Sequence, residues 1–69
     1  MTTDQINNNF SYHAPKGDQQ ERYEVIREAA KQMAILINAA CPESREKALA
    51  MTNLEQSIMW ANAAIARNE

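Results

Sequence analysis

The chain has 69 residues, enough for a single domain. Chains below about 70–80 residues seldom bury enough apolar surface to be stable without a disulfide, a metal or a partner subunit. One cysteine excludes an intramolecular disulfide, and one histidine excludes metal clusters of the usual Cys/His spacing. Seven basic and nine acidic side chains give a net charge of −2, which disfavours a binder of DNA or RNA polymers because these attract proteins with a basic excess. We therefore expect a homo-oligomer without metal or cofactor.

Residues 1–9, MTTDQINNN, are polar and predict a flexible, frayed lead-in. They contain no apolar core of a signal peptide, and no apolar run in the chain approaches the roughly 20 residues that span a bilayer. The sequence thus predicts a cytoplasmic protein without membrane contact, in which Cys41 stays reduced.

Residues 10–17, FSYHAPKG, predict an ordered loop. Pro15 disfavours helical dihedral angles at Ala14, and Gly17 ends the segment. This loop is the one non-helical stretch that carries both aromatic and cationic side chains.

Two long helices should follow the loop. Asp18 predicts the N-cap of the first helix, with Glu21 completing a capping box, and this helix should end near Ala40. Ser44 predicts the N-cap of the second helix, which should end near Arg67. A connection of about four residues favours an antiparallel arrangement. The predicted fold is therefore all-α: an antiparallel two-helix hairpin with a short N-terminal segment, in which residues 10–69 form one domain for oligomerisation and ligand binding.

Apolar residues recur at alternating spacings of three and four along both helices, which predicts two seams that face each other. The seams comprise Tyr23, Ile26, Ala30, Met33, Ile37 and Ala40 on the first helix and Met51, Leu54, Ile58, Ala61 and Ile65 on the second. Leu49 and Trp60 lie on another side of the second helix. A lone hairpin would leave this apolar surface exposed, so we expect other copies to cover it.

No arrangement of residues predicts an enzyme. The sequence contains no set of nucleophile, histidine and acid, and its single glycine excludes a glycine-rich phosphate loop. Glu24 and Glu28 belong to the charged side of the first helix, where we expect them to pair with Arg27 and Lys31.

The loop side chains Phe10, Tyr12, His13 and Lys16 leave two interpretations open. In the first, the aromatic rings simply pack onto Trp60 or onto a neighbouring hairpin. In the second, the rings form a stacking platform beside cations, because aromatic rings stack on bases at about 1–3 kcal/mol each and basic side chains bind phosphate.

The arginines of the two helices leave similar alternatives. Arg27 is either a solvated surface charge or a phosphate ligand. Arg67 either stabilises the negative end of its helix, worth less than about 1 kcal/mol, or supplies one arginine per subunit to a ring on a symmetry axis. A ring of this kind suits a polyanion of matching symmetry.

Three stretches of the chain resemble a known family. The stretches FSYHAPK, RYEVIREAA and CPESREKALAMTNLEQSIMWANAAIAR are similar to the small α-hairpin domain of phage anti-CBASS sponges, which bind cyclic oligonucleotides. The hairpin part of a Thoeris anti-defence protein is similar as well. The resemblance covers residues 10–67, and its most specific part is SREK followed by MWANAAIAR.

The resemblance implies a hexamer, a trimer of dimers, that sequesters cyclic nucleotide messengers without cleaving them. Cyclic dinucleotides in the family occupy pockets between protomers, and the matching positions here are Tyr12 and Arg27, with His13 and Lys16 as companions. Cyclic trinucleotides in related proteins lie on three-fold axes, and Arg67 is the matching position for them. The implied activity is therefore the blocking of CBASS-type antiphage signalling in the cytosol of a host bacterium.

One alternative from a different class stays open. The apolar side at Leu49 and Trp60 also suits a small structural or adaptor protein that docks on the helices of a partner.

Overall fold

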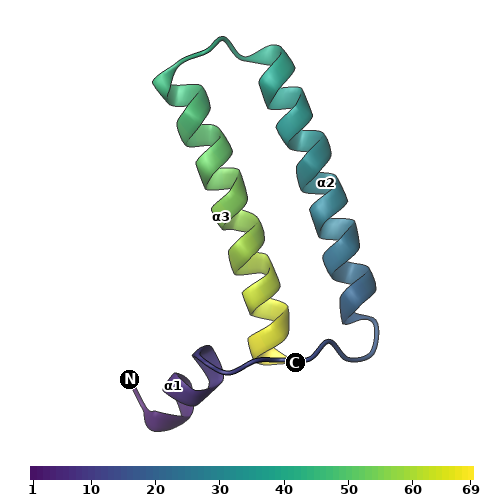
Figure 1. Ribbon diagram of the computed structural model, residues 1–69, viewed down its shortest axis with the longest axis vertical. Coiled ribbons are helices and arrows are strands. Elements are labelled where there is room, and N and C mark those ends of the chain that lie inside the picture. The colour runs from purple at the N-terminus through teal and green to yellow at the C-terminus, as the bar shows by residue number, and fades with distance from the viewer.

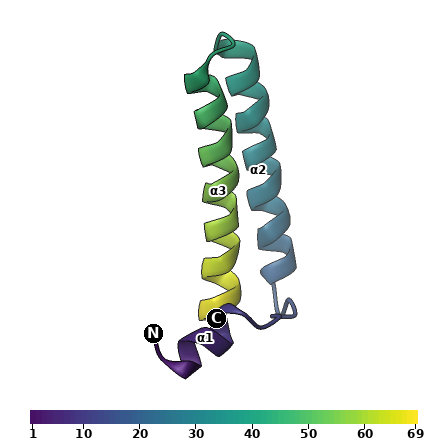
Figure 2. The same cartoon turned by 60° about the vertical axis from the view of Figure 1, so that its left-hand side comes forward.

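The computed structural model describes residues 1–69 and contains three helices, α1 (Thr3–Asn9), α2 (Gln19–Ala40) and α3 (Arg45–Asn68), with no strand. Helices α2 and α3 run antiparallel, α1 lies beside the C-terminal end of α3, and the loop after α1 crosses the end of the hairpin to α2 (Figure 1). The same arrangement is clear after a rotation of 60° (Figure 2). The predicted all-helical hairpin is thus confirmed.

The molecule is a thin slab, with extents of 45 × 29 × 13 Å. The smallest extent is close to the diameter of one helix with its side chains, about 10–12 Å. The hairpin is therefore a single layer of helices, and each helix has one neighbour at most along its length.

Helix α3 begins as the sequence predicts. The Oγ atom of Ser44 accepts a hydrogen bond of 3.1 Å from the backbone N–H of Lys47, which satisfies one of the donors that a helix N-terminus leaves free. The helix continues to Asn68, one residue beyond the predicted end, and Arg67 lies in its last turn.

Helix α2 begins after Asp18, but the predicted capping box is wrong. The side chain of Asp18 makes no capping hydrogen bond, because φ −91° and ψ 11° at this residue differ from the extended backbone that usually turns a cap side chain toward the helix. Its carboxylate pairs instead with Arg22, at 3.2 Å from Nη2. Gln19 stabilises the start of the helix by accepting a hydrogen bond of 3.1 Å from the backbone N–H of Lys16.

The N-terminal segment differs from the predicted lead-in, because residues 3–9 form α1. Thr2 and Gln5 make a capping box, in which the Thr2 side chain accepts from the Gln5 backbone at 3.1 Å and the Gln5 side chain accepts from the Thr2 backbone at 2.7 Å. This reciprocal pair is the local signal for a helix in an otherwise polar stretch.

The bend between α2 and α3 is held by Lys47, which is 9% exposed. Its Nζ atom donates to the backbone carbonyl of Asn38 at 3.1 Å and to Glu43 at 2.5 Å. The carbonyl of Asn38 belongs to the last turn of α2, where carbonyls lack a helical partner and where positive charge is favoured. Lys47 therefore fastens the start of one helix to the end of the other.

No apolar side chain is fully buried. Most residues of the two predicted seams are half-buried between α2 and α3, whereas Met33 and Ala40 are exposed. The exposed large apolar residues are Met1, Ile6, Phe10, Tyr12, Val25, Met33, Ile35, Leu36, Leu49, Met59 and Trp60. The prediction that a lone hairpin leaves apolar surface in water is confirmed. None of the three helices has the length and apolarity needed to cross a bilayer.

Candidate functional site

The end of the hairpin that carries α1 brings distant parts of the chain together. The last turns of α3, the first turns of α2 and the loop after α1 all meet there (Figures 1 and 2). This end holds most of the hydrogen bonds between residues far apart in the sequence.

A hollow of about 390 Å³ opens at this end. Its walls are formed by Asn9, Ser11, His13, Tyr23, Arg27, Asn62, Ala63, Ala66 and Arg67. Three of the five predicted site residues, His13, Arg27 and Arg67, thus line one hollow. The sequence placed Arg27 and Arg67 in separate kinds of pocket, and the fold brings them to the same one within a single chain.

The hollow is cationic although the protein is acidic. Neither Arg27 nor Arg67 takes part in an ion pair, and no carboxylate is among the lining residues. The pairs predicted between Arg27 and the neighbouring Glu24 and Glu28 are not formed; Glu28 instead accepts a hydrogen bond from Gln32. The acidic side chains that give the net charge of −2 therefore lie outside the lining of the hollow, and the guanidinium groups of Arg27 and Arg67 line it without a counter-charge.

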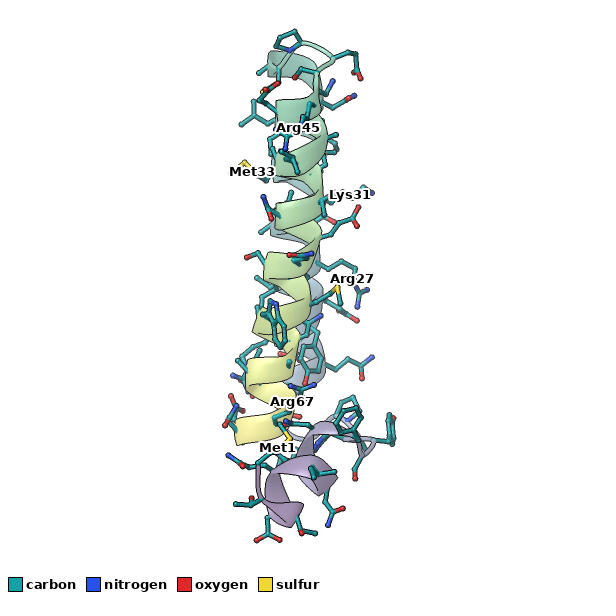
Figure 3. All side chains as sticks on the ribbon, turned by 90° about the vertical axis from the view of Figure 1, so that its left-hand side faces the viewer. Met1, Arg27, Lys31, Met33, Arg45 and Arg67 are labelled. Atoms are coloured by element: carbon teal, nitrogen blue, oxygen red, sulfur yellow. The ribbon has the colours of Figure 1, made fainter.

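Arg67 and His13 also contact the end of α1. Nη2 of Arg67 lies 3.5 Å from the carbonyl oxygen of Asn9, and the Nδ2 atom of Asn8 donates to the carbonyl of Arg67 at 3.0 Å. Nε2 of His13 lies 2.7 Å from the carbonyl oxygen of Asn8, so this nitrogen carries the proton. Figure 3 shows Arg67 at the α1 end of the hairpin, below Arg27.

Six of the nine lining residues were not predicted as site residues, and Tyr23 and Asn62 are the two of them on the long helices that carry polar groups. Tyr23 belongs to the predicted seam, but it is only half-buried and its side chain also borders the hollow. Asn62 lies in the alanine-rich stretch WANAAIAR, and its Oδ1 atom is buried without a hydrogen-bond partner. A polar side chain among alanines beside an apolar seam was the available signal for Asn62.

Two predicted residues are not in the hollow. Tyr12 is 87% exposed, and Lys16 is exposed with its backbone N–H bonded to Gln19. Both belong to the loop that borders the hollow through Ser11 and His13. Within one chain, the ring of Tyr12 is directed to solvent rather than onto Trp60 or another aromatic ring.

A second hollow of about 430 Å³, with an apolar floor and charged residues among its lining, lies along the groove between α2 and α3. It is lined by Arg27, Ala30, Lys31, Ala34, Leu54, Glu55 and Ile58. Arg27 thus stands between the two hollows, and Figure 3 shows Arg27 and Lys31 projecting from the same side of the hairpin.

Beside the polar hollow, Glu69 joins the end of α3 to the start of α2. Its carboxylate accepts hydrogen bonds from Arg22 and from Gln19. The hydrogen bond from Arg22 holds the pKa of Glu69 at about 2, below its ordinary value of 4.5, and the same contact raises the pKa of Arg22. Both terminal nitrogens of Arg22 thus have acidic partners, whereas Arg27 and Arg67 in the polar hollow form no ion pair.

The residues of this end have the chemistry to hold an anion that carries flat rings. No cluster of three or more His, Cys, Asp or Glu side chains is placed to bind a metal ion. Arginine forks suit phosphate oxygens, and a tyrosine ring suits a base.

The fold and the site together define a helical hairpin that carries a cationic hollow at its open end. The family model described as "Acb2/Tad1, hairpin domain" matches residues 2–66. The chain therefore belongs to the Acb2/Tad1 hairpin family, and the resemblance inferred from the sequence motifs is confirmed. No curated protein and no solved structure matches the chain.

Proposed function

We propose that this protein is a non-catalytic sponge of phage origin that binds cyclic di- and trinucleotide immune messengers in the host cytosol and so blocks CBASS-type antiphage signalling. Membership of the Acb2/Tad1 hairpin family supports a sponge-type anti-defence role. The observation that carries the proposal for this chain is the polar hollow, where Arg27 and Arg67 lack counter-charges in a protein of net charge −2.

The proposed binding mode follows from the chemistry of a cyclic nucleotide, which presents phosphates on a ring and flat bases around it. Arg27 and Arg67 donate to phosphate oxygens, and charge-assisted hydrogen bonds of this kind are about twice as strong as neutral ones. Tyr12 provides a face on which a base stacks, with His13 and Lys16 as additional donors from the same loop. Sequestration requires affinity and slow release only, because the signal falls as the free messenger concentration falls.

We further propose that the hairpin works as a homo-oligomer, with a hexamer built as a trimer of dimers as the form that the family resemblance implies. The absence of any fully buried apolar side chain supports association, since a single layer of two helices cannot shelter its own apolar residues. The 87% exposure of Tyr12 supports a role for its ring in contacting a neighbouring copy. In such an assembly, Tyr12 of one copy closes the site of another.

The test is a thermal-shift experiment with a panel of cyclic di- and trinucleotides. A ligand that binds only the folded protein raises Tm by mass action. At a ligand concentration of a hundred times Kd, the free energy of unfolding increases by about 2.7 kcal/mol. The bound nucleotide should be recovered chemically unchanged after heat denaturation. Recovery of a hydrolysed product would contradict a non-catalytic sponge, and the absence of any shift across the panel would remove the proposal.

A second candidate function rests on the apolar side of α3. Trp60 and Met59 are both 67% exposed. Two neighbouring large apolar side chains with this exposure are typical of an interaction surface. A structural or adaptor protein would dock this side on partner helices. If the protein is an adaptor, Trp60→Ala abolishes partner binding, whereas Tyr12→Ala and Arg67→Ala leave it intact. If the protein is a sponge, Tyr12→Ala and Arg67→Ala lose nucleotide binding.

A further inference from the structure

Two of the groups in the polar hollow that could bind an anion, His13 and Arg67, each already contact a backbone carbonyl in the free protein. The carbonyl of Asn8 accepts from His13 at 2.7 Å, and the carbonyl of Asn9 accepts from Arg67 at 3.5 Å. Both carbonyls belong to the last turn of α1, where carbonyl oxygens have no partner inside the helix. Of the three cationic or imidazole groups in the hollow, Arg27 alone is free of such a contact.

We propose that the C-terminal end of α1 competes with the anion for Arg67 and His13. A bound phosphate displaces this end of α1 from both side chains. This inference rests on the proposed function, because it requires the hollow to bind an anion. It adds a regulation of that site: ligand binding is coupled to the release of α1.

The contact with Arg67 is weak enough to be displaced. A hydrogen bond between an arginine and a phosphate oxygen is typically about 2.7–2.9 Å long, whereas the Arg67–Asn9 contact is 3.5 Å. A phosphate therefore gains a shorter and stronger contact than the one it replaces. The carbonyl oxygens of Asn8 and Asn9 also carry partial negative charge, so they repel an anion that enters beside them.

Helix α1 is itself held loosely. None of its residues is buried, and its two hydrogen bonds to the hairpin both end on Arg67: one from the Asn8 side chain to the Arg67 carbonyl, and one from the Arg67 guanidinium to Asn9. An isolated helix of seven residues is unstable in water, because helices shorter than about 12–15 residues are marginal alone. Displacement of the Arg67 guanidinium leaves the Asn8 side chain as the one hydrogen bond from α1 to the hairpin, so α1 should unfold more often.

The experiment measures amide hydrogen exchange of residues 3–9 and nucleotide affinity in the full chain, with cyclic di-AMP and cyclic tri-AMP as probes. Ile6→Pro removes the N–H that bonds to the Thr2 carbonyl at 3.0 Å and breaks α1, whereas Ile6→Ala keeps the helix. Neither residue change touches the hollow. As controls, circular dichroism should show an unchanged hairpin in both variants, and native mass spectrometry should show an unchanged assembly.

A second pair of variants tests the tether directly. Asn8→Ala removes the hydrogen bond to the Arg67 carbonyl, and Asn7→Ala makes the same change one residue earlier, at an exposed side chain that forms no hydrogen bond. In the free protein, Asn8→Ala should accelerate exchange of α1 and Asn7→Ala should not.

The expected result is that a bound probe accelerates exchange in α1, and that Ile6→Pro binds it about three- to tenfold more tightly than Ile6→Ala, the gain that loss of a competing hydrogen bond or two produces. Binding by Ile6→Pro alone supports the inference as well. Binding with unchanged or slower exchange, or with equal or weaker affinity in Ile6→Pro, overturns the inference and leaves the proposed function standing. Failure of both the natural chain and Ile6→Pro to bind either probe overturns the inference for these messengers, and the same failure across the whole panel of cyclic nucleotides overturns the proposed function as well.

Discussion

Replacing Arg27 by glutamine separates ligand binding from stability. The guanidinium of Arg27 is exposed, forms no ion pair and lines the polar hollow. Glutamine keeps a polar side chain and removes the charge. Since hydrogen bonds from charged groups contribute about 1.5–3 kcal/mol, the Kd for a cyclic dinucleotide should rise about 10- to 150-fold. The free energy of unfolding should change by less than about 0.5 kcal/mol, as is usual for an exposed residue without a partner.

The matched control is Lys31→Gln, one turn further along the same side of α2 (Figure 3). Lys31 is also exposed and unpaired, but it does not line the polar hollow. A charge about 10 Å from a phosphate contributes only about 0.4 kcal/mol in water, so its loss should weaken binding about twofold.

Isothermal titration calorimetry at one fixed ionic strength measures both affinities, and urea unfolding measures both stabilities. An equal loss of affinity in the two variants would refute a specific contact between Arg27 and the ligand, because it would indicate a general field of positive charge. An Arg27→Gln protein that binds like the natural chain would refute that contact as well.

Three further predictions concern the bend, the end pair and the assembly. Lys47→Met keeps the apolar stem but removes the donor to the Asn38 carbonyl, so the free energy of unfolding should fall by about 1–3 kcal/mol in urea titrations at fixed protein concentration. The Glu69 carboxyl should titrate by NMR near pH 2, so that the stability from its pair with Arg22 is present above pH 4.5 and is lost as the pH falls toward 2. Trp60→Glu places a charge on the exposed apolar side of α3 and should shift sedimentation toward smaller species.

Each of these predictions has a clear contrary outcome. A Lys47→Met protein as stable as Lys31→Met would show that the buried ammonium contributes nothing to the bend. An ordinary Glu69 titration near pH 4.5, unchanged by Arg22→Gln, would show that the pair is absent in solution. An assembly of the same mass after Trp60→Glu would place the contact surface elsewhere.

Much of the fold was predictable because its signals are local. The spacing of apolar residues along α2 and α3 and the Ser44 cap depend on neighbours within about four residues, and both appear where the sequence indicates them. The Asp18 capping box failed because Arg22, one turn away, offers the carboxylate a charged partner. Helix α1 was missed because its capping box at Thr2 and Gln5 lies in a stretch without apolar periodicity.

The candidate site was only partly predictable, because it depends on residues about 40–60 positions apart. Arg27 and Arg67 were recognised as cations of interest, but their placement in one hollow requires α2 and α3 to run antiparallel in the observed register. Tyr23 and Asn62 were missed as site residues because each reads locally as part of a helix surface.

The sequence by itself determined the helical hairpin, its family and the types of side chain that can hold a phosphate or stack on a base, since periodicity, caps and motifs are carried by short stretches. The tertiary structure decided which of those side chains meet. Antiparallel packing returns the end of α3 to the start of α2, and α1 lies beside that end of α3, where its last carbonyls contact His13 and Arg67. A hollow without a counter-charge, and a helix end that occupies its donors, arise only from this meeting of distant segments.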